Sequence, residues 1–532
     1  MKVIIVGAGT SGWLTASALK RNCPEMDITM VYDSSIPTVG VGETLSFALP
    51  GFMRNTLGLQ DEQWMRDVQA TYKTGLWLYD WTAPGSVQQI RHITDFPTDV
   101  LLSSSLDSIA QLKNYADQDS RDRYATRGGI VDVWYTLFQK GELGNDYNHL
   151  MSSLSEAYHF GSTAKSHRDC DGNWLTNQYT GYSYHYNAEN VSNVVGNLVG
   201  RPAGVKEIDS RVVEVVTDNG IIKELKLANG NTVTADLYID CSGFKRLLVS
   251  ALPYTWQDCD EFYNNSAVVK QIPYSDKDHP AHRITNSTTL AAMDSGWRFS
   301  VPLQNRSGNG YVFNSRTNPD IDKLYDEFES KVQSNNPGVY RLIQWNPGYY
   351  KKAAVGNCIA LGLASGFTDP YDANNLNLTC TLVTDIIQEV RTNPNWRYNL
   401  VNFTNYKSEL YWDDVDMRVQ SSLRLSPRRD TEHYRLMADV AEQTRLRERF
   451  VEHIVKIRQR DYSTARQHLW PVWTHILVAL RNGVEFPCID VDPMVAEVAK
   501  HYFDYNNVKY KLKAQLAPSE KEFYQSYKEI GI

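Results

Sequence analysis

The chain has 532 residues, of which 42% are hydrophobic and 22% are charged, and its formal net charge is −8. These values are ordinary for a globular protein with two or more lobes, and the negative charge gives no support for nucleic-acid binding. No apolar run approaches the length of a membrane span, and the first residues read as a strand and not as a signal peptide, so we expect a cytoplasmic protein with no membrane partner.

Seven cysteines are scattered along the chain, without a Cys-x-x-Cys motif and without histidines gathered near them. This distribution is typical of reduced thiols and not of a disulfide framework or a metal site. We therefore predict no metal.

A dinucleotide-binding signature follows the first predicted strand, which covers residues 3–6. The run Gly7-Ala8-Gly9-Thr10-Ser11-Gly12 matches Gly-x-Gly-x-x-Gly, in which the glycines permit a tight turn, approach to a pyrophosphate and close helix–strand packing. Residues 13–19 predict the helix that follows, and residues 28–32 predict a second strand that ends at Asp33. An acidic residue at this distance suits a ribose hydroxyl, so the pattern predicts an NAD or FAD site.

Two more segments within the first 81 residues fit an enzyme that binds a dinucleotide and uses a lysine in its chemistry. Residues 36–44 contain the run Gly40-Val41-Gly42-Glu43, and Thr71-Tyr72-Lys73 places a lysine among aromatic and apolar neighbours. The alternatives are an ordinary turn with Asp33 at the surface and a surface lysine at position 73. The glycines alone do not separate NAD from FAD.

The middle of the chain predicts loops followed by short strands. Residues 85–175 are polar and rich in Gly and Asp, which predicts loops and short helices over the core. Residues 211–216 and 221–227 predict strands, and the run 232–239 could pair with them through the turn Asn229-Gly230.

The remaining elements complete an α/β architecture. Residues 236–243 predict an apolar strand ending in Ser-Gly, which in two-dinucleotide-fold flavoproteins returns beside the cofactor, and residues 355–362 predict another short strand before a glycine-rich turn. From about residue 380 the pattern is helical and charged. We expect a Rossmann-type FAD-binding module, similar to flavin monooxygenases, over residues 1–390 and a mainly helical substrate module over residues 391–532.

These motifs together resemble the flavin-dependent halogenases of the tryptophan-halogenase type over most of residues 1–483. The matching segments are Gly12-Trp13, the flavin strap 40–43, Tyr72-Lys73, the returning strand 240–244 and the segment 310–316. The chain would be a divergent member of that family, and a marine phage is one source that we consider for it.

Two family motifs are altered. The family's Trp-x-Trp-x-Ile-Pro, a wall between substrate and flavin, is Trp297-Arg298-Phe299-Ser300-Val301-Pro302 here and keeps roughly apolar bulk. The family's Pro-Leu-Glu-Ser-Thr-Gly is Pro370-Tyr371-Asp372-Ala373-Asn374-Asn375, so Asp372 stands for the catalytic glutamate and Ala373 for its neighbouring serine. Asp369 is a second carboxylate that could take the same role.

The resemblance implies that reduced FAD and O2 oxidise a halide to hypohalous acid, which is relayed to Lys73 and delivered to an electron-rich aromatic small molecule. It implies Lys73 and Asp372 as catalytic residues, and Asn374 and Asn375 as the backbone donors of the halide site. The implied FAD-binding residues are Gly7, Ala8, Gly9, Thr10, Ser11, Gly12, Asp33, Gly42, Glu43, Val212, Leu363 and Leu376. The implied substrate pocket contains Trp297, Phe299 and Trp470.

Substrate, halide and partners follow from the same comparison of motifs. The tyrosine-rich segment that clasps free tryptophan in the family has no clear counterpart, because residues 440–466 are charged and helical, so we expect an indole, a phenol or another electron-rich arene. Bromide and iodide are easier to oxidise than chloride and are expected to be preferred. No second glycine-rich NADPH signature is found, which predicts a separate NAD(P)H flavin reductase, and we allow a homo-oligomer.

Two alternatives remain open on the sequence. One is a flavin monooxygenase that hydroxylates or epoxidises its substrate directly. The other is a flavin-binding protein that has lost activity, since the altered motifs at Phe299, Asp372 and Ala373 depart from the family.

Overall fold

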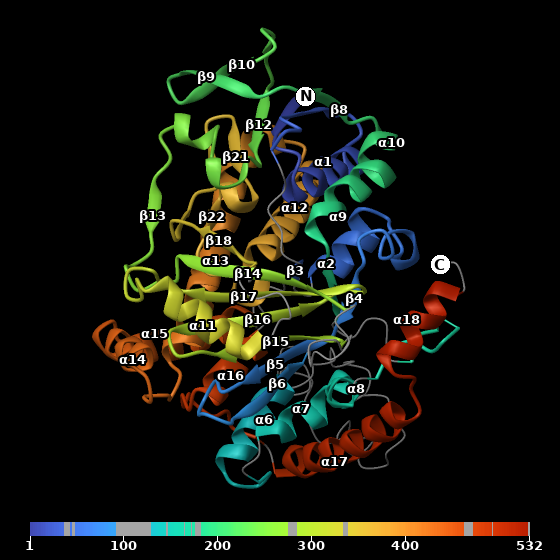
Figure 1. Cartoon of the computed structure of the whole chain (residues 1–532), viewed down its shortest axis with the longest axis vertical. Helices are drawn as coiled ribbons and strands as arrows, with labels where there is room; N and C mark the ends of the chain where they lie inside the picture. The colour runs from blue at the N-terminus through green and yellow to red at the C-terminus, as the bar shows by residue number, and fades with distance from the viewer. Residues whose placement is uncertain are drawn as a thin grey trace. The chain divides into compact units, whose positions relative to one another are not determined.

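The structure is a computed structural model of residues 1–532 (Figure 1). Its first two strands, at residues 2–6 and 27–32, pair in parallel. The structure describes the chain except residues 37–42, 45–47, 92–128, 145–146, 164, 172, 176–181, 275–284, 333–338, 462–471, 492 and 530–532. Two compact units share the chain. Unit 1 comprises Met1–Tyr72, Ser183–His282 and Arg298–Asp416, and unit 2 comprises Lys73–Tyr182, Arg283–Trp297 and Met417–Ile532.

A six-stranded sheet with the order β20-β21-β12-β1-β2-β8 forms the framework of unit 1. Its neighbours from β21 to β8 are parallel, and β20 is antiparallel to β21. The strands are β1 (Lys2–Val6), β2 (Asp27–Tyr32), β8 (Lys206–Asp209), β12 (Leu237–Asp240), β20 (Ala354–Val355) and β21 (Cys358–Ala360). The apolar runs predicted from sequence are the buried central strands, as expected for a parallel sheet covered on both faces.

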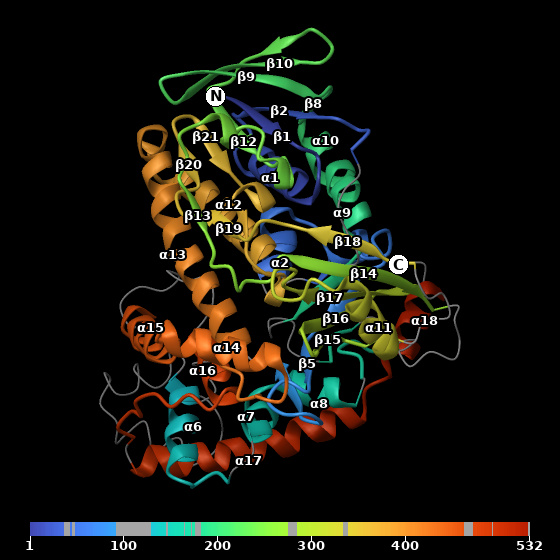
Figure 2. The same ribbon diagram turned by 60° about the vertical axis from the view of Figure 1, so that its left-hand side comes forward.

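Helices of unit 1 pack beside this sheet. Helix α1 (Thr10–Asn22) contacts α9 (Ala188–Val195) and α12 (Asn374–Thr392), and the three lie close together in both views (Figure 1 and Figure 2). The predicted module boundary after residue 390 lies inside α12. The other helices of unit 1 are α2 (Ala48–Gly51), α10 (Arg201–Ala203) and α11 (Ile321–Val332), and α13 (Trp396–Arg424) begins in unit 1 and continues into unit 2.

Smaller sheets complete unit 1. The order β11-β10-β9 holds β9 (Val212–Asp218), β10 (Ile221–Leu227) and β11 (Thr232–Val233). The order β13-β19-β22 holds β13 (Trp256–Asp258), β19 (Gly348–Tyr350) and β22 (Gly366–Phe367). The order β3-β7-β4 holds β3 (Glu43–Thr44), β7 (Ser183–Tyr186) and β4 (Thr71–Lys73). Strand β14 (Ser266–Pro273) pairs with β17 (Arg306–Phe313) and β18 (Arg341–Gln344), and β16 (Gly296–Pro302) contains the division between the units in sequence.

Unit 2 is mainly helical. Its strands are β5 (Gly75–Tyr79), β6 (Val87–Arg91) and β15 (Ser287–Ala292), with β5 paired to both of the others. Its helices are α6 (Gly129–Gln139), α7 (Tyr147–Leu154), α8 (Glu156–Ser162), α14 (Glu432–Gln443), α15 (Leu446–Asp461), α16 (Val472–Arg481), α17 (Pro493–Gln515) and α18 (Glu520–Glu529). Within the described ranges, no helix combines the length and the apolar character that a bilayer crossing requires.

Three strand predictions are corrected by the structure. The run 232–239 is not one strand, because β11 ends the hairpin sheet while β12 crosses to the six-stranded sheet and pairs with β1. The run 355–362 is a hairpin of β20 and β21, because Gly356 turns the chain with a φ of 58°. Residues 87–91, predicted as loop, form β6.

Candidate active site

The turn between β1 and α1 shows why its three glycines differ. Gly7 has a φ of 108°, and an ideal Cβ there would lie 2.3 Å from the carbonyl oxygen of Cys241. A Cβ on Gly12 would lie 1.9 Å from the carbonyl oxygen of Gly7. A Cβ on Gly9 would meet no atom within 4 Å. The outer glycines are therefore required by packing, whereas the middle glycine borders open space.

That open space lies at the N-terminus of α1. Gly9 is the N-cap residue and offers no side-chain hydrogen bond, so the first N–H groups of the helix are not capped by it. Uncapped N–H groups and the positive end of the helix dipole form an anion site that suits a pyrophosphate. The glycine-rich turn after β21 reaches the same helix, since a Cβ on Gly362 would lie 2.3 Å from Oγ of Ser11. These residues fit a dinucleotide.

The returning strand β12 ends in a fixed turn. Its last residue, Asp240, is fully buried and accepts hydrogen bonds from the backbone N–H and the hydroxyl of Ser242, at 2.9 and 2.6 Å. Its second oxygen accepts from the N–H groups of Leu248 and Val249 at 2.8 and 3.0 Å. The carboxylate therefore holds the Ser-Gly turn in place. This turn lies beside Gly7, because the carbonyl oxygen of Cys241 fills the space where a Cβ on Gly7 would be.

The other predicted flavin residues have varied surroundings. Asp33 is half-buried just after β2, and the hydrogen bonds that it accepts from the hydroxyl and N–H of Ser35 lower the pKa of its carboxyl. Leu363 and Leu376 are half-buried, whereas Val212 is buried in an apolar cluster with Ile4, Val6 and Val31. Gly42 lies outside the described residues, and Glu43 is described only as the first residue of β3.

Lys73 is the last residue of β4 and is buried, with 5% of its surface exposed. The alternative of a surface lysine is therefore wrong. Tyr72 beside it donates to a carboxylate oxygen of Asp61 at 3.0 Å, and the same carboxylate accepts from Tyr184 at 2.6 Å and from Arg54 at 2.9 Å. Asp61 has 1% of its surface exposed, so a buried ionic network holds one face of the strand that carries Lys73.

Asp372 and Ala373 lie in consecutive left-handed conformations, with φ of 60° and 53°. Side chains other than glycine rarely adopt this region, and such conformations concentrate at functional sites. Asp372 is buried, with 9% of its surface exposed. The left-handed pair forms the turn that starts α12.

Asp369, the alternative carboxylate, already has structural partners. One of its oxygens accepts from the side-chain amide of Asn264 at 2.8 Å, and the other accepts from the N–H of Tyr371 at 2.9 Å. With 2% of its surface exposed, it acts as a buried cap of the turn.

The two asparagines at the start of α12 use their side chains within the loop. Asn374 donates to the carbonyl oxygen of Tyr371 at 2.7 Å. Asn375 donates to the carbonyl oxygens of Gly362 and Gly366, at 3.2 and 2.6 Å. The side chains thus fix the backbone of the segment for which the sequence predicts the halide site.

The wall motif lies on β16. Trp297 is buried and Phe299 is half-buried. The Phe299 ring lies against the backbone of Gly310 on β17, where a Cβ would be 2.3 Å from the ring. Glycine at position 310 therefore leaves the space that the end of the Phe299 ring occupies. Trp470, the third pocket residue predicted, lies outside the described residues.

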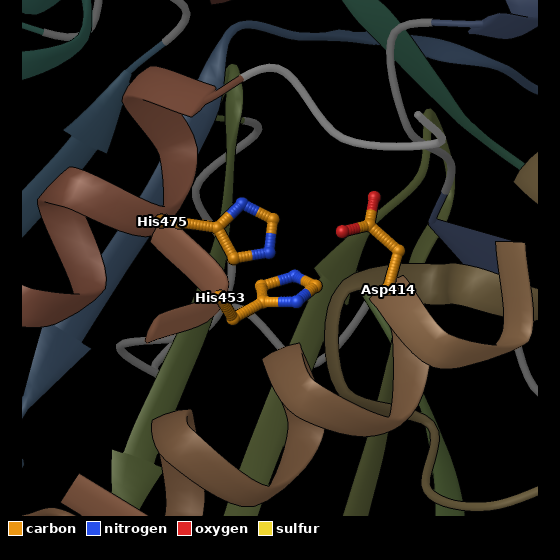
Figure 3. A group of neighbouring side chains, drawn as sticks. All are labelled: Asp414, His453 and His475. Carbon is orange, nitrogen blue, oxygen red and sulfur yellow. The ribbon is translucent and has the colours of Figure 1, made fainter. Parts of the chain in front are cut away.

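Unit 2 contains a histidine pair that the sequence analysis did not identify. His453 on α15 and His475 on α16 have ring centroids 5.1 Å apart (Figure 3). Figure 3 also draws Asp414, which belongs to unit 1.

Comparison with known proteins agrees with these features. The family model for tryptophan halogenase matches residues 2–499. Tryptophan 7-halogenase RebH of Lentzea aerocolonigenes is 29% identical over 441 residues, covering 82% of this chain and 78% of the relative. Tryptophan 6-halogenase ThaL of Streptomyces albogriseolus is 27% identical over 442 residues, covering 81% of this chain and 78% of the relative.

Solved structures share the whole fold. A tryptophan halogenase from Shewanella frigidimarina superposes with a TM-score of 0.81 at 20% identity, covering 100% of this chain and 98% of the other. BrvH, a flavin-dependent halogenase from Brevundimonas sp. BAL3, superposes with a TM-score of 0.76 at 22% identity, covering 98% and 99%. The expected α/β fold with a Rossmann-type module is therefore confirmed. The chain belongs to the tryptophan halogenase family, whose members are flavin-dependent enzymes.

Proposed function

We propose that this enzyme halogenates an electron-rich aromatic small molecule, such as an indole or a phenol, with FADH2, O2 and a halide. The balanced reaction takes FADH2, O2, one halide, one proton and the arene C–H, and gives FAD, two waters and the carbon–halogen bond. Bound reduced flavin and O2 supply the oxidising equivalents that turn halide into hypohalous acid. The remaining steps fall to residues of this chain.

The turn of β1 and α1 binds FAD in this proposal. Gly7 and Gly12 hold backbone segments in contact, and Gly9 leaves the space that the pyrophosphate occupies at the helix N-terminus. Asp33, at the end of β2, accepts a hydrogen bond from a ribose hydroxyl. A separate NAD(P)H flavin reductase supplies the reduced form.

The burial of Lys73 at the end of β4 carries the proposal for halogen transfer. Its Nζ donates a hydrogen bond to hypohalous acid or accepts the halogen as a haloamine, and a shielded site keeps the oxidant from water. Asp372, held in its left-handed turn, orients the oxidant or takes the proton that the arene loses. Asn374 and Asn375 present backbone N–H groups to the halide.

The wall motif separates halogenation from direct oxygenation. Trp297 and Phe299 supply apolar bulk on one face of β16, since alternate residues of a strand share a face. In the proposed role they keep the arene away from the flavin, which disfavours hydroxylation.

The test is a mass-resolved reaction with FAD, a flavin reductase, NADH, bromide and an activated phenol or indole. A product that gains bromine supports halogenation, whereas a product that gains only oxygen would show a monooxygenase. No product while FADH2 is oxidised would favour a flavin-binding protein without halogenase activity.

Lys73→Ala separates the two halves of the reaction. This variant should still oxidise FADH2 with O2 while forming no brominated product. Lys73→Arg keeps a cation but removes the amine, so it separates hydrogen bonding from haloamine formation. A Lys73→Ala variant that halogenates at the wild-type rate would remove Lys73 from the mechanism.

A further inference from the structure

We propose that Thr71 is a positioning residue for Lys73, and that its hydroxyl sets the place of the lysine by bonding to Pro302 and His185. The inference rests on the proposed role of Lys73. It gives roles to Thr71 and His185, to which the sequence analysis assigns none.

The hydroxyl of Thr71 makes two short hydrogen bonds in a fully buried place. It donates to the carbonyl oxygen of Pro302 at 2.7 Å, and it lies 2.9 Å from Nδ1 of His185. A hydroxyl has one proton, so at His185 it accepts and Nδ1 is the donor. Thr71 and His185 both have 0% of their surface exposed.

The alternation of a strand links this anchor to the lysine. Thr71 and Lys73 are two residues apart on β4, so their side chains leave the same face of the strand. Tyr72 leaves the opposite face, where Asp61 accepts its hydroxyl proton. The Thr71 hydroxyl is therefore a polar anchor on the same face of the strand as Lys73.

The two partners of Thr71 come from elements that matter for the proposed reaction. Pro302 is the last residue of the wall motif on β16. His185 is on β7, where it pairs in register with Thr44 of β3, directly after Glu43 of the predicted flavin strap. The hydroxyl of Thr71 thus connects β4, which carries Lys73, to the end of the wall motif on β16 and to β7, the strand that pairs with β3.

Removing the hydroxyl should move Lys73 without unfolding the strand. Thr71→Val keeps the shape and the β-branched character, which strands favour. The Asp61 network on the opposite face remains intact in this variant. Since a displacement of about 1 Å can cost roughly 10²-fold in rate, a loosely held amine should capture hypohalous acid poorly.

The experiment measures two quantities for each FADH2 that is oxidised: the amount of brominated product, and the amount of hypobromite that escapes into solution. Wild type, Thr71→Val and Thr71→Ser are given FADH2, O2, bromide and an activated arene, with a second set of reactions containing a soluble scavenger of free hypobromite. Thr404→Val is the matched control, because Thr404 is equally buried and its hydroxyl has no hydrogen-bond partner within the described residues. Melting temperatures are recorded for all four proteins.

We expect Thr71→Val to oxidise FADH2 at the wild-type rate, to form about 10-fold to 10²-fold less product per FADH2, and to release more scavengeable hypobromite. Thr71→Ser, which restores the hydroxyl, and Thr404→Val should keep the wild-type ratio. An unchanged product ratio in Thr71→Val would overturn the inference.

Two variants of His185 separate a positioning role of the Thr71 hydroxyl from a general folding defect. His185→Asn retains a donor near the position of Nδ1, whereas His185→Leu removes it. Loss of FADH2 oxidation together with product in both Thr71→Val and His185→Leu would show a purely structural role and would also overturn the inference. Failure of the proposed function is distinct from either result, because wild-type protein itself would then give no brominated product.

Discussion

The side-chain amide of Asn375 donates a hydrogen bond to the carbonyl oxygen of Gly366 at 2.6 Å, and it donates a second one to the carbonyl oxygen of Gly362 at 3.2 Å. The side chain of Asn375 therefore holds the start of α12 to the glycine-rich turn after β21. Asn375 stands where the resemblance places a family glycine, and its side chain adds two hydrogen bonds to the loop that we propose as the halide site.

Halide selectivity is the first prediction. A loop that is not shaped for chloride should follow the intrinsic ease of oxidation, so bromide and iodide should be incorporated faster than chloride. Competition between halides at equal concentration measures this directly, with the products separated by mass. Equal rates for chloride and bromide would show that the loop still holds a chloride-selective site.

Asn375→Ala provides the matched variant for this prediction. It removes both bonds to Gly362 and Gly366, and alanine is a good helix former at this position. We expect slower halogenation at low bromide and recovery at high bromide, because a loosened backbone binds the anion less well. A variant with wild-type bromide dependence would separate the asparagine from halide binding.

The second prediction uses the open space at Gly9. Gly9→Val should abolish FAD binding while leaving the melting temperature close to that of wild type, because a Cβ there meets no protein atom and the backbone is extended, with a φ of −74°. Calorimetric titration with FAD and thermal unfolding measure the two effects.

Gly12→Ala serves as the contrast at the same turn. Its Cβ would lie 1.9 Å from the carbonyl oxygen of Gly7, so this variant should lower the melting temperature. Normal FAD affinity in Gly9→Val would place the pyrophosphate elsewhere.

Short-range patterns predicted much of the fold from sequence. The β1–α1–β2 unit follows from apolar runs, glycine spacing and an acidic residue that lie within 33 residues of one another. The strand predicted at 236–243 corresponds to β12 at Leu237–Asp240, and its Ser-Gly end is the signal for it. The pattern at 355–362 predicts one strand where Gly356 makes a hairpin, because a single glycine inside an apolar run is a weak signal.

Contacts between distant segments explain what the sequence did not predict. Thr71 bonds to Pro302, 231 residues away, and lies beside His185, 114 residues away. No local periodicity encodes such partners. The sequence analysis singled out Lys73 by its aromatic and apolar neighbours and gave no role to Thr71, because the partners of Thr71 lie far away in the chain.

The third prediction concerns the charge of Asp372. Asp372→Asn should lower halogenation by about 10²-fold to 10⁴-fold, the usual cost of removing a general acid–base group. Asparagine tolerates the left-handed conformation as well as aspartate does, so this substitution changes the charge and not the turn. Product formation and FADH2 oxidation are measured side by side.

Two further variants complete that test. Asp372→Glu restores the family residue and should retain more activity than Asp372→Asn. Asp369→Asn should lower the melting temperature, because its carboxylate accepts from Asn264 and from the N–H of Tyr371. Equal activity of Asp372→Asn and wild type would move the role away from this carboxylate.

The last prediction is a pH dependence of stability that arises from Glu520 on α18. This side chain has 1% of its surface exposed, and burial raises the pKa of its carboxyl to about 8, although Asn286 opposes the shift. An unfolded chain would have the ordinary pKa near 4.5, so the folded state keeps the proton over the window from about 4.5 to 8. The free energy of unfolding should therefore fall as pH rises through this window and level off above it.

Glu520→Gln removes the titration and should raise the melting temperature above that of wild type at pH 8, with the difference vanishing near pH 4.5. Glu522→Gln is the matched control on the same helix, because Glu522 is exposed and hydrogen bonds from Ser519 lower its pKa. This control should leave the slope between pH 5 and 8 unchanged, since Glu522 is ionised throughout that range. Thermal unfolding from pH 4.5 to 8.5 measures all three proteins, and parallel curves for Glu520→Gln and wild type would mean that Glu520 does not titrate within this window.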